Sequence, residues 1–340
     1  MKKSSVILLC ICLLILTFTF NVSADQITDE TIITKLNILE DTKLEIRHNY
    51  ELEDVYGNNR YKLIVFKNKG YLIYDQISNN IMEYSLNSVE FPYCEFIDSD
   101  FDLIYCGPLN YIVHKNNLYY EIHTMEIVDI DLTREYYDSL LVNEESSVQT
   151  TTSWTGISSS RFYNYKGSAW QNSGNNVNCC GPISTAIMIA YYQDYLNPIL
   201  EFSTSVRDPS NPTSPGTLIT KIKNSTVSPT ATVPVTICNG VNVFLNNYNI
   251  ASTYTCAYSS TSTWNNAVTK IGAGRPVAIG ISGLAMYNGV NPNDYGWHWV
   301  TAYGYRTIDG SGYYRCIDNW GNYDVAIKTI TTVGIVYLSR

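Results

Sequence analysis

The feature that most constrains this chain is a Cys-Gly-Pro string followed by a helical pattern. After Cys180, Gly181 and Pro182, apolar residues recur three and four positions apart: Ile183, Ala186, Ile187, Ala190 and Tyr191. This spacing is typical of the buried face of a helix, and proline suits the first turn. The string therefore places two cysteines, Cys179 and Cys180, at a helix N-terminus. Unpaired N–H groups and the helix dipole favour a thiolate there, although a structural disulfide at a helix start is an equally ordinary interpretation.

The first 24 residues have the features of a secretory signal peptide. Lys2 and Lys3 precede an apolar stretch over 6–20, and Val22-Ser23-Ala24 forms a small-residue cleavage site. No later stretch reaches the roughly 18 apolar residues that a membrane span needs. We expect the mature chain to be secreted and extracellular, without a membrane span.

Charge divides the mature chain into two parts. Residues 25–160 contain 24 acidic and 9 basic side chains, whereas residues 161–340 contain 7 acidic and 11 basic ones. The two parts could dock electrostatically, or each charge could only solubilise its own domain. With a net charge of −9, no nucleic-acid partner is expected.

The acidic part is predicted to be a small, mostly-β domain over 25–145. Aromatic and β-branched runs at 61–66, 71–75, 81–85 and 117–122 are separated by turn residues such as Asn-Lys-Gly and Ser-Asn-Asn. A second Cys-Gly-Pro string begins at Cys106, but a strand-like run follows it rather than a helix, so this string is not a second site. Residues 146–160 are polar and small, and predict a linker that a protease could cut.

The second part, 161–340, mixes helices and strands. Further helices are predicted at 216–224, 241–248 and 261–271, and strands at 250–258, 276–281, 297–305, 313–318 and 325–338. Helices that come first and strands that follow predict an α+β domain.

Histidine is scarce, and His298 is the only one in the second part. It begins a predicted strand after a loop rich in Gly, Asn and Pro, where an imidazole can act as general base to a thiol. The alternative is a structural histidine between two tryptophans. A metal site is not expected, because this part has no other histidine and no Cys-x-x-Cys motif.

Twenty residues after His298 the chain reads Asp318-Asn319-Trp320-Gly321. Asp318 or Asn319 could accept a hydrogen bond from the far ring nitrogen of His298 and fix its tautomer, and Trp320 could shield that pair from water. The plain alternative is a strand that ends in a turn.

The order of these elements resembles the papain-like cysteine peptidases. The similarity covers about 161–340 and is greatest to the bacteriocin-processing peptidase-like branch, in which Cys-Gly-Pro opens the nucleophile helix and a His-x-Val strand precedes an Asp. The resemblance implies a nucleophile helix packed on an antiparallel sheet. By position it implies Cys180 as nucleophile, His298 as base and Asp318 as the orienting group, with no cofactor. Cys180 is chosen over Cys179 because Gly-Pro follows it directly.

Two positions depart from the family pattern. The family has a glutamine about six residues before its cysteine, which completes the oxyanion hole. Here Gln171 lies nine residues before Cys180, so Gln171 after a longer loop, or Asn175, would take that role. Cys179 has no counterpart.

Apart from Cys180 and the cysteines of the signal peptide, six cysteines remain. An exported chain could pair them, for example as 94–106, 238–256 and 179–316, although their connectivity is not deducible.

The resemblance implies a secreted cysteine endopeptidase that hydrolyses peptides or proteins through a thioacyl-enzyme. The charge division and the linker add the expectation of a zymogen, in which residues 25 to about 150 form an inhibitory or folding-assisting prodomain. Spacing alone leaves two alternatives open. One is a cell-wall peptide amidase or acyl transferase on the same triad, and the other is a non-enzymatic extracellular binding protein that uses the acidic, tyrosine-rich half.

Overall fold

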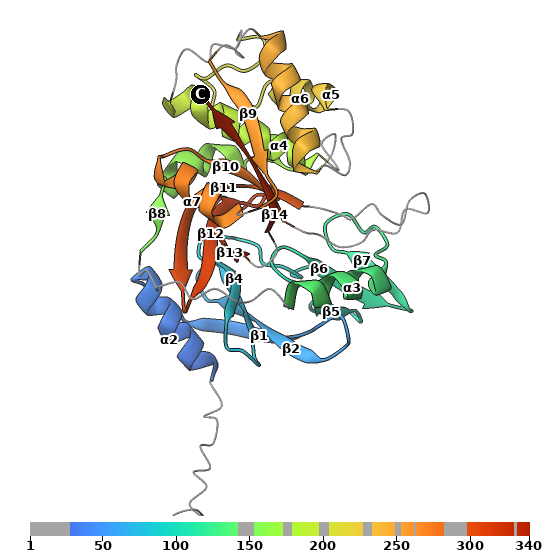
Figure 1. The fold of residues 1–340 in the computed structure, drawn as a ribbon. Helices are drawn as coiled ribbons and strands as arrows, with labels where there is room; N and C mark the ends of the chain where they lie inside the picture. Colours follow the sequence, from blue (N-terminus) through green and yellow to red (C-terminus); the bar gives the residue numbers. More distant parts are fainter. Residues whose placement is uncertain are drawn as a thin grey trace, which may run out of the picture.

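The computed structural model describes residues 28–141, 153–172, 179–196, 204–226, 233–248, 253–261, 263–281, 298–329 and 332–340. The predicted signal peptide, Asn175 and most of the predicted linker lie outside the described residues. Within them the protein is a mixed α+β structure, with one large sheet and helices on its faces (Figure 1).

The N-terminal half contains more helix than the sequence patterns predict. Its strands include the four predicted ones, and two helices, α2 and α3, flank them. The polar segment near 25–45 holds α2 because Ile32, Ile33 and Leu36 share one buried face. The elements are α2 (Asp29–Glu40), β1 (Ile46–Glu53), β2 (Asn59–Phe66), β3 (Tyr71–Asp75), β4 (Ile81–Ser85), β5 (Asp102–Tyr105), β6 (Tyr111–Lys115), β7 (Leu118–Glu121) and α3 (Ile130–Leu141).

The C-terminal half begins with short elements: β8 (Thr155–Gly156), the 3-10 helices η1 (Ser159–Lys166) and η2 (Ser168–Trp170), α4 (Cys180–Tyr191) and the π-helical turn η4 (Tyr192–Leu196). Three helices and a strand follow: α5 (Leu218–Ser225), α6 (Pro234–Asn247), β9 (Thr255–Ser259) and α7 (Thr263–Gly272). The chain ends in strands β10 (Val277–Ile281), β11 (His298–Ile308), β12 (Ser311–Ile317), β13 (Val325–Lys328) and β14 (Thr332–Ser339).

Two predictions in this half differ from the structure. The helix predicted at 241–248 begins earlier, at Pro234, because proline is tolerated in the first turn and Ile237 and Cys238 continue the buried face. The single strand predicted at 325–338 is two strands, β13 and β14, in different parts of the sheet. Near the end of the predicted linker, β8 pairs with β11, so Thr155 and Gly156 belong to the sheet.

One sheet crosses both halves of the chain. Its strand order is β7-β6-β5-β1-β2-β3-β4-β13-β12-β11-β10-β14-β9. The halves join where β4 pairs antiparallel with β13, opposing Ser85 to Val325 and Glu83 to Ile327. Strand pairing across 240 positions of sequence therefore holds the acidic half to the rest.

Two ion pairs of opposite polarity join the two halves of the chain. Glu40 of α2 forms an ion pair at 2.6 Å with Arg306, whose side chain is fully buried. Its acidic member comes from the N-terminal half and its basic member from the C-terminal half, as the charge division predicts. Lys35 pairs with Asp309 in the opposite polarity. The expectation of electrostatic docking is therefore only part of the explanation, since backbone hydrogen bonds and buried apolar surface also join the halves.

Alternate residues of the central strands face two separate cores. Along β10 and β11, Ala278 and Tyr303 contribute to the core under α4, α5 and α6, whereas Ile279 and Val300 face the core that contains Ile271 of α7. This second core continues into the N-terminal half, where it includes Tyr61, Tyr71, Tyr105 and Tyr111. The period of two in side-chain direction places α4 and α7 on opposite faces of the sheet.

Candidate active site

The first predicted site residue, Cys180, opens α4. From Gly181 to Tyr191 every residue of this helix is buried, because the sheet covers one side and α5 and α6 cover the other. Cys180 itself is half-buried, whereas Cys179 is fully buried and its main-chain N–H donates to Asn172 Oδ1 at 2.8 Å. Of the two neighbouring cysteines, Cys180 is therefore the more accessible.

The second, His298, is the first residue of β11, the strand against which α4 packs. The main-chain N–H of Trp299 lowers the pKa of the Cys180 thiol, so the start of this strand lies near the sulfur. Thr301 of the same strand donates its hydroxyl to the Ser184 carbonyl of α4 at 3.0 Å. This hydrogen bond joins α4 and β11 four residues after Cys180.

The His298 ring is held by the turn after β12. Nε2 of His298 lies 2.7 Å from the main-chain carbonyl oxygen of Asp318. A carbonyl can only accept, so Nε2 carries the proton, and in the neutral ring Nδ1 is the unprotonated nitrogen. The sequence led us to expect a side-chain acceptor from Asp318 or Asn319, whereas the acceptor is the Asp318 backbone.

The Asp318 carboxylate instead closes its own turn. It accepts the main-chain N–H groups of Trp320 at 2.8 Å and Asn322 at 3.0 Å, and the Asn322 amide at 2.7 Å. Burial raises the pKa of this carboxyl to about 6, although these hydrogen bonds oppose the shift. Because both carboxylate oxygens are used in the turn, the side chain shapes the loop that presents the carbonyl.

Asn319 connects the turn to α4. Its Nδ2 donates to the carbonyl oxygens of Trp299 (2.6 Å) and Cys180 (3.3 Å) and to the hydroxyl of Ser184 (2.8 Å). The residue has φ 65°, in the left-handed region that asparagine tolerates better than most residues. One amide therefore connects α4, β11 and the turn.

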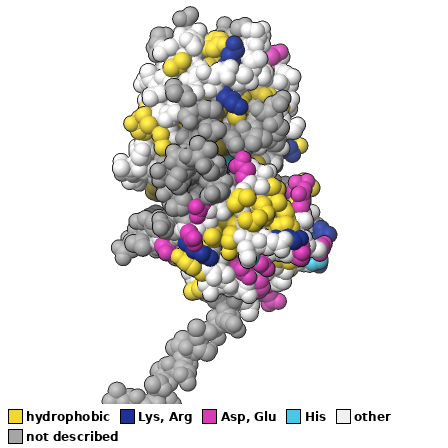
Figure 2. Space-filling model, turned by 90° about the vertical axis from the view of Figure 1, so that its right-hand side faces the viewer, with side chains coloured by type: hydrophobic (Ala, Val, Ile, Leu, Met, Phe, Trp, Pro, Cys, Tyr) yellow, Lys and Arg dark blue, Asp and Glu magenta, His cyan; other side chains and the backbone are white. Residues whose placement is uncertain are grey.

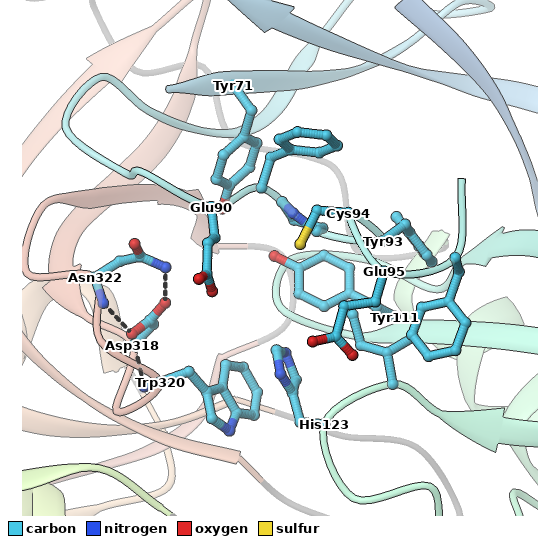
Figure 3. Close-up of a pocket in the computed structure, with 14 residues that line it drawn as sticks. Tyr71, Glu90, Tyr93, Cys94, Glu95, Tyr111, His123, Asp318, Trp320 and Asn322 are labelled. Atoms are coloured by element: carbon cyan, nitrogen blue, oxygen red, sulfur yellow. Dashed lines mark hydrogen bonds between the residues drawn. The ribbon is translucent and has the colours of Figure 1, made fainter. Parts of the chain in front are cut away.

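Trp320 is stacked between two imidazoles, an arrangement we name the Trp320 stack. His298 lies on one face of the indole, with ring centroids 3.8 Å apart and planes at 7°, and His123 lies on the other at 3.9 Å and 17°. His123 follows β7, so the N-terminal half supplies it (Figure 3). Sequence reasoning set His123 aside because it lies in the acidic half, and no local pattern connects it to Trp320.

A second contact joins the N-terminal half to this turn. The Ser88 hydroxyl donates to Oδ1 of Asn322 at 2.6 Å, while Nδ2 of the same amide donates to the Asp318 carboxylate. Asn87 also donates to the Asp324 carboxylate at 2.7 Å. The turn that holds His298 is thus supported from residues more than 230 positions earlier.

The side chain of Gln171, the predicted oxyanion donor, forms its hydrogen bond with Lys166. Its Nε2 donates to the carbonyl of Lys166 at 3.1 Å, next to Gly321. Its neighbour Asn172 contacts the cysteine pair instead, through the N–H of Cys179. The alternative donor, Asn175, lies outside the described residues.

Burial dominates the ionisation of the site. It raises the pKa of the Cys180 thiol to about 11, although the N–H groups of Trp299 and Gly181 lower it, and it lowers the pKa of His298 to about 4 against the opposing effect of the Asp318 carbonyl. Burial thus opposes the thiolate that the donors at the helix N-terminus favour. Both shifts favour the neutral forms of the Cys180 thiol and the His298 imidazole.

No disulfide bond joins the seven cysteines of the described residues. Cys238 and Cys256 are neighbours, since the Cys238 thiol donates to the Cys256 carbonyl at 3.0 Å. Cys179 and Cys316 belong to separate cores on opposite faces of the sheet, which contradicts the example pairing 179–316. Cys106-Gly-Pro forms the turn between β5 and β6, not a helix start, as its sequence predicts.

The comparison with protein families decides the identity of the second half. The peptidase C39-like family model matches residues 162–333, which is just over half of the chain. The chain belongs to the peptidase C39-like family. This is a family of papain-like cysteine peptidases related to the bacteriocin-processing peptidases, so the resemblance seen in the sequence is confirmed.

The match to the peptidase C39-like family includes Cys180, His298 and the turn 318–324, and leaves the N-terminal half outside it. No curated protein matches the chain at a significant level. Among the described residues, no helix combines the length and the apolar character that crossing a bilayer requires.

Proposed function

We propose that this protein is an exported cysteine endopeptidase in which Cys180 is the nucleophile and His298 the base. One observation carries the proposal: the Asn319 amide donates to the carbonyl oxygens of both Cys180 and Trp299, so the helix that Cys180 opens and the strand that His298 opens meet at one point. The hydrogen bond from His298 Nε2 to Asp318 leaves Nδ1 as the basic nitrogen. Family membership supports the reaction class.

The mechanism follows from this protonation state. His298 Nδ1 takes the Cys180 proton as the sulfur attacks a peptide carbonyl, and the resulting imidazolium is stabilised by the Asp318 carbonyl. The Cys180 N–H is one oxyanion donor, and Gln171 becomes the second if its amide turns away from Lys166. His298 then protonates the leaving amine, and water hydrolyses the thioester.

The experiment compares the secreted protein with its Cys180→Ala and His298→Ala variants on casein and on peptidoglycan. Cleavage of casein that both substitutions abolish supports the endopeptidase. Release of peptides from peptidoglycan alone would replace it by a cell-wall amidase. If a thiol-directed probe leaves Cys180 unlabelled and neither substrate is cut, the non-enzymatic alternative stands.

For the N-terminal half we propose a folding-assisting prodomain that stays bound after any cut. The pairing of β4 with β13, the Ser88–Asn322 hydrogen bond and the Trp320 stack support this role over a releasable inhibitor. Removal of the half would expose the edge of β13 and the apolar core below it.

The test of this role uses the secreted protein with a protease site inserted between Ser147 and Val148. After cleavage, both fragments should elute together and retain activity. Separation into an active 148–340 fragment would overturn the proposal. Sequencing the N-terminus also tests export, which predicts a start at Asp25.

A further inference from the structure

A cavity of about 240 Å³ lies on the seam between the two halves, beside the Trp320 stack. Trp320, Asp318 and Asn322 of the turn line one side. The N-terminal half supplies the other side, chiefly from the segment 90–96 and from His123. Both halves of the chain are therefore needed to form it.

Two carboxylates point into this cavity. Figure 3 shows Glu90 and Glu95 directed toward the space above Trp320 and His123. Neither carboxylate forms an ion pair within the described residues, and no lysine or arginine is among the residues that line the cavity. Acidic side chains also gather around an apolar area on the same half of the surface (Figure 2).

The remaining walls are aromatic. Phe91, Phe96 and Tyr111 line the space that the two carboxylates face, together with the edge of the Trp320 indole, whose two faces are covered by His298 and His123. Aromatic faces attract cations through their quadrupole, and they also accept the methylene stem of a long basic side chain. The combination of unpaired carboxylates and rings fits the side chain of lysine or arginine.

The reaction places one end of a substrate near this cavity. His298 must protonate the leaving amine, so the residues after the scissile bond lie on the His298 side of the thiol. The His298 ring is in contact with Trp320, which forms a wall of the cavity. Each residue of an extended peptide advances about 3.3–3.6 Å, so three residues after the scissile bond span about 10 Å, which exceeds the 3.8 Å between the His298 and Trp320 rings.

We propose that the cavity is a specificity site that receives a lysine or arginine side chain from the leaving half of the peptide. Glu90 and Glu95 provide the charge, and Phe91 and Phe96 provide aromatic walls. The inference rests on the proposed peptidase function, and it assigns a substrate class to that site.

The experiment sequences the cleavage sites in a peptide library digested by the full chain. Wild-type protein should show lysine and arginine enriched roughly tenfold at one of the first three positions after the cut, because two partly exposed ion pairs and a cation–π contact discriminate by about this factor. High salt should weaken the enrichment. The Glu90→Gln/Glu95→Gln variant should lose it, and Glu90→Lys/Glu95→Lys should favour acidic residues at the same position.

The control variant Asp98→Asn/Glu126→Gln removes two exposed negative charges from the same half that do not line the cavity. It should retain the wild-type enrichment, and thermal unfolding checks that all variants fold. Wild-type cleavage without this preference, or the same preference in the double Gln variant, overturns the inference and leaves the peptidase intact. If the wild-type chain cuts no peptide, the proposed function fails, and the inference fails with it.

Discussion

The imidazole of His298 is oriented by the backbone of Asp318, through a hydrogen bond of 2.7 Å from Nε2 to the carbonyl oxygen. In a Ser-His-Asp triad the acidic side chain itself makes this contact, and its change to Asn removes about four orders of magnitude from the rate. Here the carboxylate accepts three hydrogen bonds within its own turn. The contribution of Asp318 is therefore geometric.

This relationship predicts a mild effect for Asp318→Asn. The Asn oxygen can keep both main-chain N–H bonds and loses only the bond from the Asn322 amide, so kcat/KM should fall by no more than roughly tenfold. Asp318→Ala removes all three bonds and should lower activity and thermal stability further. Steady-state kinetics on one peptide substrate measures both variants. A loss near 10⁴ for Asp318→Asn would instead assign a charge role to the carboxylate.

The ionisation of Cys180 predicts a distinctive alkylation profile. Because burial raises the pKa of the thiol to about 11 and lowers that of His298 to about 4, the free protein holds a neutral pair over the intervening pH range. The rate of iodoacetamide labelling at Cys180 should rise steadily between pH 6 and 9 as thiolate forms. A rate that is already constant from about pH 5 would indicate a thiolate–imidazolium pair and contradict this prediction.

His123 is predicted to act as a positioning residue through Trp320. His123→Ala frees one face of the indole and should lower kcat by roughly tenfold, since a small displacement of His298, the proposed base, is costly. His123→Phe restores the stacking and should recover most of the loss, which a role in proton transfer would not allow. His48→Ala, an exposed histidine of the same half, is the control. If His123→Ala and wild-type protein have equal kinetics, His123 does not position His298 through Trp320.

Glu83 predicts a pH-dependent stability. This buried carboxyl accepts hydrogen bonds from Tyr71, Tyr105, Tyr111 and the Leu109 N–H, yet burial raises its pKa from 4.5 to about 7. The pKa of Glu83 is higher in the folded protein than in the unfolded chain. The stabilisation that its protonated form gives the fold is therefore fully present below about pH 4.5 and is lost as the pH rises through 7.

Relative to Glu83→Gln, wild-type protein should therefore lose about 3 kcal/mol of unfolding free energy between pH 4.5 and 8. Denaturant titrations of both proteins at several pH values measure this difference. His298 and Asp318 titrate in both proteins, so their contributions cancel. Parallel stability curves for the two proteins would show that Glu83 keeps an ordinary pKa in the fold.

Gln171 should matter only if its amide leaves Lys166 during the reaction. If it becomes the second oxyanion donor, Gln171→Ala lowers kcat by roughly 10²–10³ with little change in KM. Asn175→Ala, measured beside it, tests the alternative donor. A Gln171→Ala enzyme with unchanged turnover would leave Gln171 as a structural contact to Lys166.

The local elements of the site can be predicted from the amino-acid sequence. The i, i+3, i+4 pattern after Pro182 predicts α4, and the apolar run before Arg306 predicts the strand that His298 opens, because both depend on short-range periodicity. The presence of a single histidine in the second half was enough to select His298. The turn residues 318–321 were also identified as one unit.

How these elements are arranged around His298 depends on the fold of the whole chain. Whether Asp318 offers its carbonyl or its carboxylate depends on how the turn closes around its own N–H groups, and no residue pattern records that choice. The pairing of β4 with β13 brings Ser88 and His123 against the turn from more than 190 positions away. Such contacts arise only when distant strands pair, because sequence periodicity determines which face of a strand is buried but not which strand lies beside it.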